Sequence, residues 1–216
     1  MQTTVPRFDS LGDALVCIVD DDDSIRRSLS RLFRSVRLPV ESFASAQTYL
    51  DRAPHDGPSC LVLDVRMPGL DGLELQQQLV HRQAQIVFLS GHADVPICAE
   101  AMKAGAVDFL TKPVDDDELL SAAHRALTRS IEVRKSMADR TAVRAKIDSL
   151  TPREFEVMQR VITGMLNKQI ADDLGAAEKT IKIHRGRVME KMGVTSVAEL
   201  VRLAHTAGVS PVTAPT

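Results

Sequence analysis

Long apolar runs, paired cysteines and a strong net charge are all missing from this sequence. No run approaches the roughly 18 apolar residues of a membrane-spanning helix, and the N-terminal stretch MQTTVPRFDSLGD lacks the basic and then apolar order of a secretory signal. The net charge of −2 over 216 residues indicates no polyanion partner for the chain as a whole. We therefore expect a cytoplasmic protein without a membrane partner.

Metal-binding spacing is also missing. Cys17, Cys60 and Cys98 show neither paired nor zinc-ligand spacing, and the histidines are scattered. The sequence therefore predicts that all three cysteines are reduced and lie in a core, and it predicts no zinc site. The length and the ordinary balance of 44% apolar and 26% charged residues favour two modest domains. From Thr151 onward nine Lys and Arg stand against seven Asp and Glu, the sign expected if this part meets an anion.

Short apolar runs alternate with helix-like segments over the first 125 residues. The runs ALVCIV, PVESF, CLVLD, QIVFLS and DFLTK lie about 20 to 25 residues apart, which predicts five strands joined by helices. Strands joined in this way are parallel, and their apolar character requires helices on both faces. We therefore expect an α/β doubly wound five-stranded parallel sheet, with its functional crevice at the carboxyl ends of the strands.

Polar residues stand at these carboxyl ends. Asp20, Asp21 and Asp22 follow the first run, and the third, fourth and fifth runs end in Asp64, Ser90 and Lys112. Clustered carboxylates repel one another unless a cation lies among them, and oxygen ligands favour Mg²⁺. Lys112 and Mg²⁺ would neutralise a phosphoryl group as an aspartate oxygen attacks it. The pattern predicts Asp64 as this acceptor, with Met67-Pro68-Gly69 turning the chain away.

A structural role competes with the chemical one at several of these positions. A strand-terminal Asp is often a turn former or helix cap, which is an alternative for Asp22, Asp23 and Asp71. Four suitably placed polar ends in one sheet nevertheless favour a shared site.

The segments CIVDDDDSIRRSL, CLVLDVRMPGLDGLEL, VFLSGHADV and AMKAGAVDFLTKP resemble the flavodoxin-like receiver domain of two-component response regulators, in the FixJ branch of the NarL/FixJ family. The resemblance runs from about Leu15 to Leu127. It implies phosphorylation at Asp64, Mg²⁺ bound by Asp21, Asp64 and the backbone carbonyl of Arg66, and Asp20 contacting the ion through a water. It further implies that Lys112 contacts the phosphoryl oxygens, that Ser90 follows that group, and that Phe109 is the switching aromatic. Arg66 and His92 lie where the family tunes the phosphoryl lifetime.

The connector from Asp115 to Leu150 contains no Gly or Pro. The segment is rich in Ala, Leu, Arg, Lys and Glu, which predicts one long helix, either continuous or with an interruption. A dimerising seam drawn from Leu119 to Ile147 includes three polar positions, Ser130, Arg140 and Arg144, and is a poor zipper. We expect a helical spacer, with a flexible tether as the alternative.

Four short helical patterns follow Leu150. Thr151 and Glu154 form a capping-box pattern with Pro152 at the first helical position, and Gly175 ends NKQIADDLG. The next helix, predicted from Glu178 to Met192, alternates core residues with Lys179, Lys182, Arg185, Arg187 and Lys191. A short helix, a tight Gly turn and a basic helix indicate a helix-turn-helix, although a solvated basic face on a structural helix would look similar.

The segments LTPREFEVMQ, NKQIADDLG and KTIKIHRGRVMEKMGV resemble the LuxR/NarL-type helix-turn-helix domain. The resemblance implies base reading from Lys179, Lys182, Ile183 and Gly186, with Arg187 or DNA shape compensating for the glycine. It offers Lys168, Thr180, His184, Arg185 and Arg187 as candidates for phosphate contacts. Ala177 stands where the family commonly has a Ser or Thr cap, which should cost about 1 kcal/mol.

These patterns predict an N-terminal extension (1–13), a receiver domain (14–127), a helical linker (128–148) and an all-α four-helix DNA-binding domain (149–216). The expected function is that of a transcriptional response regulator. A sensor histidine kinase phosphorylates Asp64 with Mg²⁺ as cofactor, and the protein then dimerises and binds double-stranded promoter DNA, with RNA polymerase as a further partner. It would be no enzyme beyond its own phosphorylation and dephosphorylation.

Two alternatives are weaker. Haloacid-dehalogenase phosphatases carry a second acid two residues after the nucleophile, whereas Val65 and Arg66 follow Asp64 here. A receiver that works without phosphate is disfavoured because its acidic residues are all present.

Overall fold

The computed structural model describes Phe8 and residues 11–91 and 95–210. The chain divides between Arg134 and Lys135 into two compact units. No helix among the described residues combines the length and the apolar character needed to cross a membrane.

The described residues of the first unit form a sheet of five parallel strands in the order β2-β1-β3-β4-β5. Its strands are β1 (Leu15–Val19), β2 (Val40–Phe43), β3 (Ser59–Asp64), β4 (Ile86–Ser90) and β5 (Asp108–Thr111). The five predicted runs therefore form the predicted doubly wound sheet. Within β1 every residue is buried, and alternate side chains enter different cores: Val16 and Ile18 one, Cys17 and Val19 the other.

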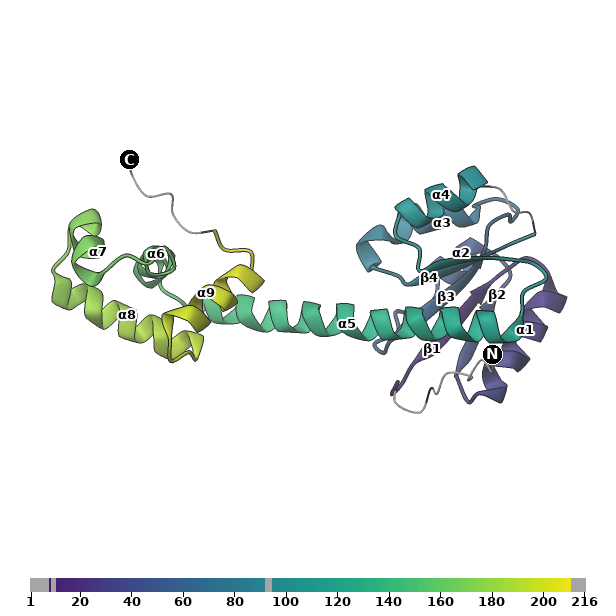
Figure 1. Cartoon of the computed structure of the whole chain (residues 1–216), viewed down its shortest axis with the longest axis horizontal. Coiled ribbons are helices and arrows are strands. Elements are labelled where there is room, and N and C mark those ends of the chain that lie inside the picture. Colours follow the sequence, from purple (N-terminus) through teal and green to yellow (C-terminus); the bar gives the residue numbers. More distant parts are fainter. Residues whose placement is uncertain (1–7, 9–10, 92–94, 211–216) are drawn as a thin grey trace, which may run out of the picture. The chain divides into compact units, whose positions relative to one another are not determined.

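Helices cover both faces of this sheet, as Figure 1 shows. The helices and one 3₁₀ turn of this part are α1 (Asp23–Ser35), α2 (Ala46–Leu50), α3 (Gly72–Leu79), η1 (Val80–Arg82), α4 (Val95–Lys103) and α5 (Asp116–Asp148). Phe33 of α1 and Leu127 of α5 pack on one face, and Leu75 of α3 and Ala101 of α4 pack on the other. Covering both faces explains why the central strands are apolar throughout.

Two of the three acids for which a structural role was an alternative, Asp22 and Asp71, cap helices. The Asp22 carboxylate accepts hydrogen bonds from the backbone N–H groups of Ser24 and Ile25 at the start of α1. Asp71 forms a capping box with Glu74 at the start of α3. These carboxylates satisfy N–H groups that would otherwise lack partners.

The predicted N-terminal extension contributes to the first core. Phe8 and Leu11 are buried in the cluster that includes Phe33, and the Phe8 ring meets the His124 ring edge-on at 5.5 Å.

The connector is one continuous helix, as the absence of Gly and Pro predicted. α5 is 33 residues long. Within the first unit, α5 packs against the core as far as Ile131. The Ser130 hydroxyl accepts a hydrogen bond from the Ser59 N–H at 3.0 Å. Residues 134–142 are all exposed, after which Val143 and Ile147 enter the core of the second unit.

The second unit adds four short helices to the end of α5. They are α6 (Pro152–Val161), α7 (Asn167–Leu174), α8 (Glu178–Met192) and α9 (Val197–Thr206). The predicted capping box between Thr151 and Glu154 opens α6, with Pro152 at its start. Gly175 ends α7 with a φ of 58°, a left-handed conformation that favours glycine. The four-helix prediction and the bounds of α8 are confirmed.

Two of the three thiols lie in the sheet and are shielded from solvent. Cys17 and Cys60 are buried, and burial raises the pKa of Cys17 to about 12 and that of Cys60 well above its ordinary range. Cys98 on α4 is partly exposed, so the prediction of a core position was wrong for this cysteine.

Candidate functional site

Three carboxylates meet at the carboxyl ends of β1 and β3, which are neighbours in the sheet. Oxygens of Asp20, Asp21 and Asp64 all lie within 4.8 Å of one another. Asp20 and Asp64 are buried, at 1% and 7% exposure, while Asp21 is open to solvent. The sheet thus brings together the acids that the sequence predicted to converge, in a pocket with one open side.

Lys112 completes this acidic pocket. Its Nζ atom lies 2.6 Å from Oδ2 of Asp20 and 2.9 Å from Oδ1 of Asp64. Burial alone would lower the pKa of Lys112, but its hydrogen bonds to the two carboxylates outweigh burial and raise it. The lysine is therefore held in its charged form between the two acids.

The negative charge of Asp64 is only partly balanced by nearby positive charge. Burial raises its pKa, and the charges of Asp20 and Asp21 act in the same direction, against the opposing effect of Lys112. One lysine thus faces three carboxylates. A pocket of this composition can hold a divalent cation, because its donors are oxygens and the added charge relieves the repulsion.

Backbone contacts hold the two buried acids in place. Asp20 accepts a hydrogen bond from the Asp22 N–H at 2.9 Å, and its carbonyl oxygen accepts one from Nη1 of Arg26 at 2.7 Å. Behind Asp64, a Cβ atom at Gly72 would lie 2.3 Å from the Asp64 carbonyl oxygen. Arg26 and Gly72 were not among the predicted site residues. Only the closeness of Gly72 to the strand end would have indicated its role.

The remaining predicted receiver residues lie around this pocket. Ser90 is buried at the end of β4, next to Leu89, the residue that pairs with Asp64 in the sheet. The Ser90 carbonyl accepts a hydrogen bond from the Lys112 N–H at 2.7 Å. Phe109 on β5 is partly buried, with its ring centroid 6.1 Å from that of Phe88. Arg66 is exposed two residues after Asp64, and His92 lies outside the described residues.

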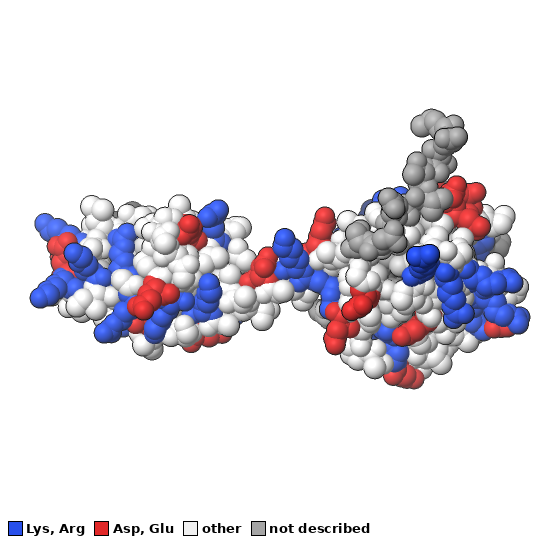
Figure 2. Space-filling view, turned by 90° about the horizontal axis from the view of Figure 1, so that it is seen from below, with Lys and Arg blue, Asp and Glu red and all other residues white. Residues whose placement is uncertain are grey.

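The second unit presents a polar helix face beside a tight turn. Most of the predicted contact residues are exposed: Lys168, Lys179, Thr180, Lys182, Ile183, Gly186 and Arg187. Ile181, Val188 and Met192 point the other way and are fully buried, so α8 packs by one face and leaves the basic face outward. Figure 2 shows Lys and Arg side chains spread over the visible face of this unit.

Two predicted phosphate contacts are partly buried. Nη1 of Arg185 donates to Oδ1 of Asn167 at 2.9 Å, which ties α8 to the start of α7. The Nδ1 atom of His184 is buried, and among the described residues it has no hydrogen-bond partner.

One exposed base of α8 forms an ion pair with another helix of the same unit. Nζ of Lys191 lies 2.6 Å from Oε2 of Glu154 and donates to the Ser149 carbonyl at 3.0 Å. The hydrogen bonds of Glu154 to Lys191 and to the Thr151 N–H lower its pKa from an ordinary 4.5 to about 2. Lys191 is exposed, and its ammonium group also neutralises a buried acid.

Comparison with known families assigns both units. Residues 16–124 match the model of the response regulator receiver domain, and residues 148–204 match that of the bacterial regulatory proteins of the luxR family.

Close relatives match nearly the whole chain. Nodulation protein W of Bradyrhizobium diazoefficiens is 48% identical, over 91% of this chain and 88% of that protein. The transcriptional regulatory protein FixJ of Azorhizobium caulinodans is 43% identical over 91% and 94%, and the response regulator protein TodT of Pseudomonas putida is 42% identical over 89% and 86%.

Solved structures of such proteins show the same fold. The response regulator StyR matches with a TM-score of 0.77 at 43% identity, over 89% of this chain and 98% of that one. Full-length FixJ from B. japonicum matches with a TM-score of 0.54 at 43% identity, over 90% and 97%. The chain therefore belongs to the two-component response regulators that join a receiver domain to a LuxR-type helix-turn-helix domain, and it is a transcriptional response regulator.

Proposed function

We propose that Asp64 accepts a phosphoryl group from a sensor histidine kinase. A carboxylate oxygen of Asp64 attacks phosphorus, the bond from phosphorus to the histidine nitrogen breaks, and the imidazole takes the electron pair as the leaving group. The observation that carries this proposal is the bridge that Lys112 makes between Asp20 and Asp64 in a pocket with one open side.

Mg²⁺ fits this pocket because its donors are oxygens and their charges are only partly balanced. Asp21, Asp64 and the backbone carbonyl of Arg66 would hold the ion, and Asp20 would contact it through a water. When bound, the ion supplies positive charge next to the transferred phosphoryl oxygens. Lys112 places a second positive charge next to these oxygens. In this proposal the chain catalyses only its own phosphorylation and dephosphorylation.

Phosphorylation would change the domain surface through Ser90 and Phe109. The support is their position: Ser90 is joined to Lys112 through the backbone, and Phe109 lies on β5 beside Phe88. The Ser90 hydroxyl would follow the phosphoryl group and allow the Phe109 ring to move inward. This change promotes homodimerisation.

The phosphorylated dimer would then bind double-stranded promoter DNA in the cytoplasm and act on RNA polymerase. The exposed side chains Lys179, Lys182 and Ile183 and the bare backbone at Gly186 would read bases in the major groove. Lys168, Thr180, His184, Arg185 and Arg187 would contact phosphates. Because Arg185 is already tied to Asn167, its contact would also fix the angle between α7 and α8.

The test of the acceptor is incubation of the full chain with acetyl phosphate and Mg²⁺, followed by intact-mass measurement. We expect one phosphoryl adduct, lost in Asp64→Asn and retained in Asp71→Asn, which alters a nearby helix cap but not the acceptor. An adduct on Asp64→Asn, or its dimerisation in response to acetyl phosphate, would refute the proposal.

The DNA contacts are tested separately. Sequences that the beryllofluoride-activated protein binds are selected from random DNA. The selection is repeated with Lys182→Ala and, as a control, with Lys103→Ala, which removes an exposed base of the first unit. We expect Lys182→Ala to relax the selected sequence at one position and Lys103→Ala to leave it unchanged. Equal selection by both variants would exclude Lys182 from base reading.

A further inference from the structure

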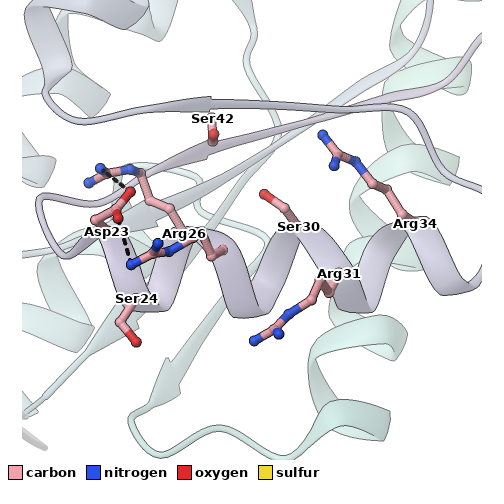
Figure 3. Close-up of a pocket in the computed structure, with 8 residues that line it drawn as sticks. Asp23, Ser24, Arg26, Ser30, Arg31, Arg34 and Ser42 are labelled. Carbon is pink, nitrogen blue, oxygen red and sulfur yellow. Dashed lines mark hydrogen bonds and ion pairs between the residues drawn. The ribbon is translucent and has the colours of Figure 1, made fainter.

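A groove lined mostly by arginine and serine lies on the first unit between α1 and β2, the edge strand of the sheet. It has a volume of about 530 Å³ and is lined by Asp23, Ser24, Arg26, Arg27, Ser30, Arg31, Arg34 and Ser42. Figure 3 shows the Ser30 hydroxyl and the Arg34 guanidinium on the side of α1 that faces the strand carrying Ser42. Of these residues only Arg26 also contacts the acidic pocket, through its hydrogen bond to the Asp20 carbonyl.

The floor of the groove is polar where a core is expected. Ser42 pairs with Ile18 in the sheet and lies two residues after Val40, which packs under α1. Ser42 itself stays exposed, while Ser30 opposite is buried at 8% exposure. Among the described residues, no partner accepts from or donates to the Ser30 hydroxyl. Two hydroxyls thus replace the apolar packing that elsewhere seals the helix onto the sheet.

The wall of the groove carries excess positive charge. Four arginines face a single carboxylate, that of Asp23, which already pairs with Arg26 at 3.0 Å and Arg27 at 2.8 Å. Within the described part of the chain, Arg31 and Arg34 have no carboxylate partner. Figure 2 shows Lys and Arg side chains gathered at the edge of the first unit where α1 lies.

This charge is local, because the first unit as a whole is acidic. Its 134 residues contain fourteen Lys and Arg against twenty Asp and Glu, and five of those fourteen lie between Arg26 and Arg37. Residues one helical turn apart are neighbours along a helix, so the backbone positions of Arg27, Arg31 and Arg34 form a row. Figure 3 shows the Arg34 side chain turned toward the Ser42 strand and the Arg31 side chain turned away from it.

We propose that this groove binds a small polyphosphate anion, of the class of the nucleoside polyphosphates. Guanidinium forks match phosphate oxygens two at a time, and serine hydroxyls donate to the same oxygens. A single phosphate would leave most of a groove of about 530 Å³ unfilled, whereas a nucleotide with several phosphates matches the usual size of ligand sites. The sparse apolar lining disfavours an uncharged hydrophobic ligand.

The test is calorimetric titration of the full chain with ATP, pyrophosphate and inorganic phosphate, in EDTA so that no divalent cation enters the acidic pocket. We expect saturable binding of one ATP per chain, weaker binding of pyrophosphate and none of inorganic phosphate. The double variant Arg31→Ala/Arg34→Ala should bind ATP at least about tenfold more weakly, because two charge-assisted contacts are lost. Ser42→Val should also weaken binding, because it removes a hydroxyl and fills the floor.

Matched controls separate this groove from the other charged surfaces. Lys179→Ala/Lys182→Ala on α8 and Asp64→Asn should bind ATP as the unaltered protein does, so the result does not depend on the proposed phosphoacceptor. Absence of saturable binding would overturn the proposal. So would loss of binding in the α8 variant alone, or a Ser42→Val protein that binds normally, since binding would then need only surface charge.

Discussion

Gly72 illustrates how a single residue can fix the acceptor strand. A side chain at this position would meet the Asp64 carbonyl oxygen, a backbone atom that cannot move aside cheaply. We expect Gly72→Ala to lower the free energy of unfolding by about 1–3 kcal/mol through overpacking, measured by urea denaturation. A variant as stable as the unaltered protein would show that the strand end yields easily.

Gly186 provides the opposite case. A Cβ atom there meets nothing within 4 Å, and the residue lies inside α8. We expect Gly186→Ala to raise the free energy of unfolding by about 0.5–1 kcal/mol, because alanine is the better helix former. The measurement is the same urea denaturation, and a loss of stability would contradict the open surroundings of this glycine.

At this scale, the sequence predicts which acids converge but not what holds them. Asp20, Asp64 and Lys112 could be grouped because the ends of parallel strands share one edge of a sheet. The bond from Arg26 to the Asp20 carbonyl depends on how α1 returns over the sheet, and no spacing rule predicts it. That Lys112 is shared between two carboxylates likewise depends on the geometry of the strand ends.

Among the elements, α6 and α8 are joined by an ion pair that makes stability depend on pH. The pKa of Glu154 is about 2 in the folded protein, below its ordinary 4.5. A lowered pKa stabilises the fold above about pH 4.5, and this contribution disappears as the pH falls toward 2. Between pH 5 and pH 2, we therefore expect the unaltered protein to lose more stability than Lys191→Met does.

The expected difference is about 1 kcal/mol, kept small because Lys191 is partly exposed. Thermal unfolding followed by the helical signal at each pH measures it. Arg144→Met removes an exposed pair with Asp148 and should leave the pH profile unchanged. Parallel profiles for Lys191→Met and the unaltered protein would show that the pair contributes nothing.

A hydroxyl group at the start of α8 should stabilise the fold. Ala177 occupies the cap position in an extended conformation, with no side-chain hydrogen bond to the helix. Ala177→Ser should raise the free energy of unfolding by about 1 kcal/mol, because a serine oxygen accepts from a free N–H of the first turn. Ala138→Ser, inside the exposed part of α5, should be slightly destabilising. Equal effects in urea denaturation would contradict a role for the cap.

The sequence predicts elements well where periodicity has room to develop. All five strands and the bounds of α8 follow from apolar patterns and glycine stops. The five-residue α2 and the three-residue η1 are too short to show a helical period. The ion pair of Lys191 could not be predicted, because its partner Glu154 lies 37 residues earlier in the chain, in another helix.

At the scale of the whole molecule, we expect α5 to be the segment most susceptible to proteolysis. Residues 134–142 are all exposed, so local opening of the helix there breaks few packed contacts. Brief trypsin treatment should cut first after Arg134, Lys135 or Arg140 and leave two stable fragments, identified by mass spectrometry. First cuts inside either unit would contradict this order of stability.

Composition alone could not locate where α5 leaves the first core and enters the second. The helix has no break, and the same residue types continue from its packed turns into its exposed ones. Only tertiary contacts, such as that of Ser130 with Ser59 and the burial of Val143, mark these points. The predicted boundaries at 127 and 149 therefore rest on the family resemblance.

The unequal accessibility of the three sulfur atoms makes the native protein a substrate for selective labelling. Maleimide reagents should attach one dye, at Cys98, since Cys17 and Cys60 are shielded within the sheet and hold their protons. A single adduct in the intact mass, abolished by Cys98→Ser, would verify this. The natural sequence would then carry a spectroscopic reporter on α4 without any cysteine having to be engineered in or out.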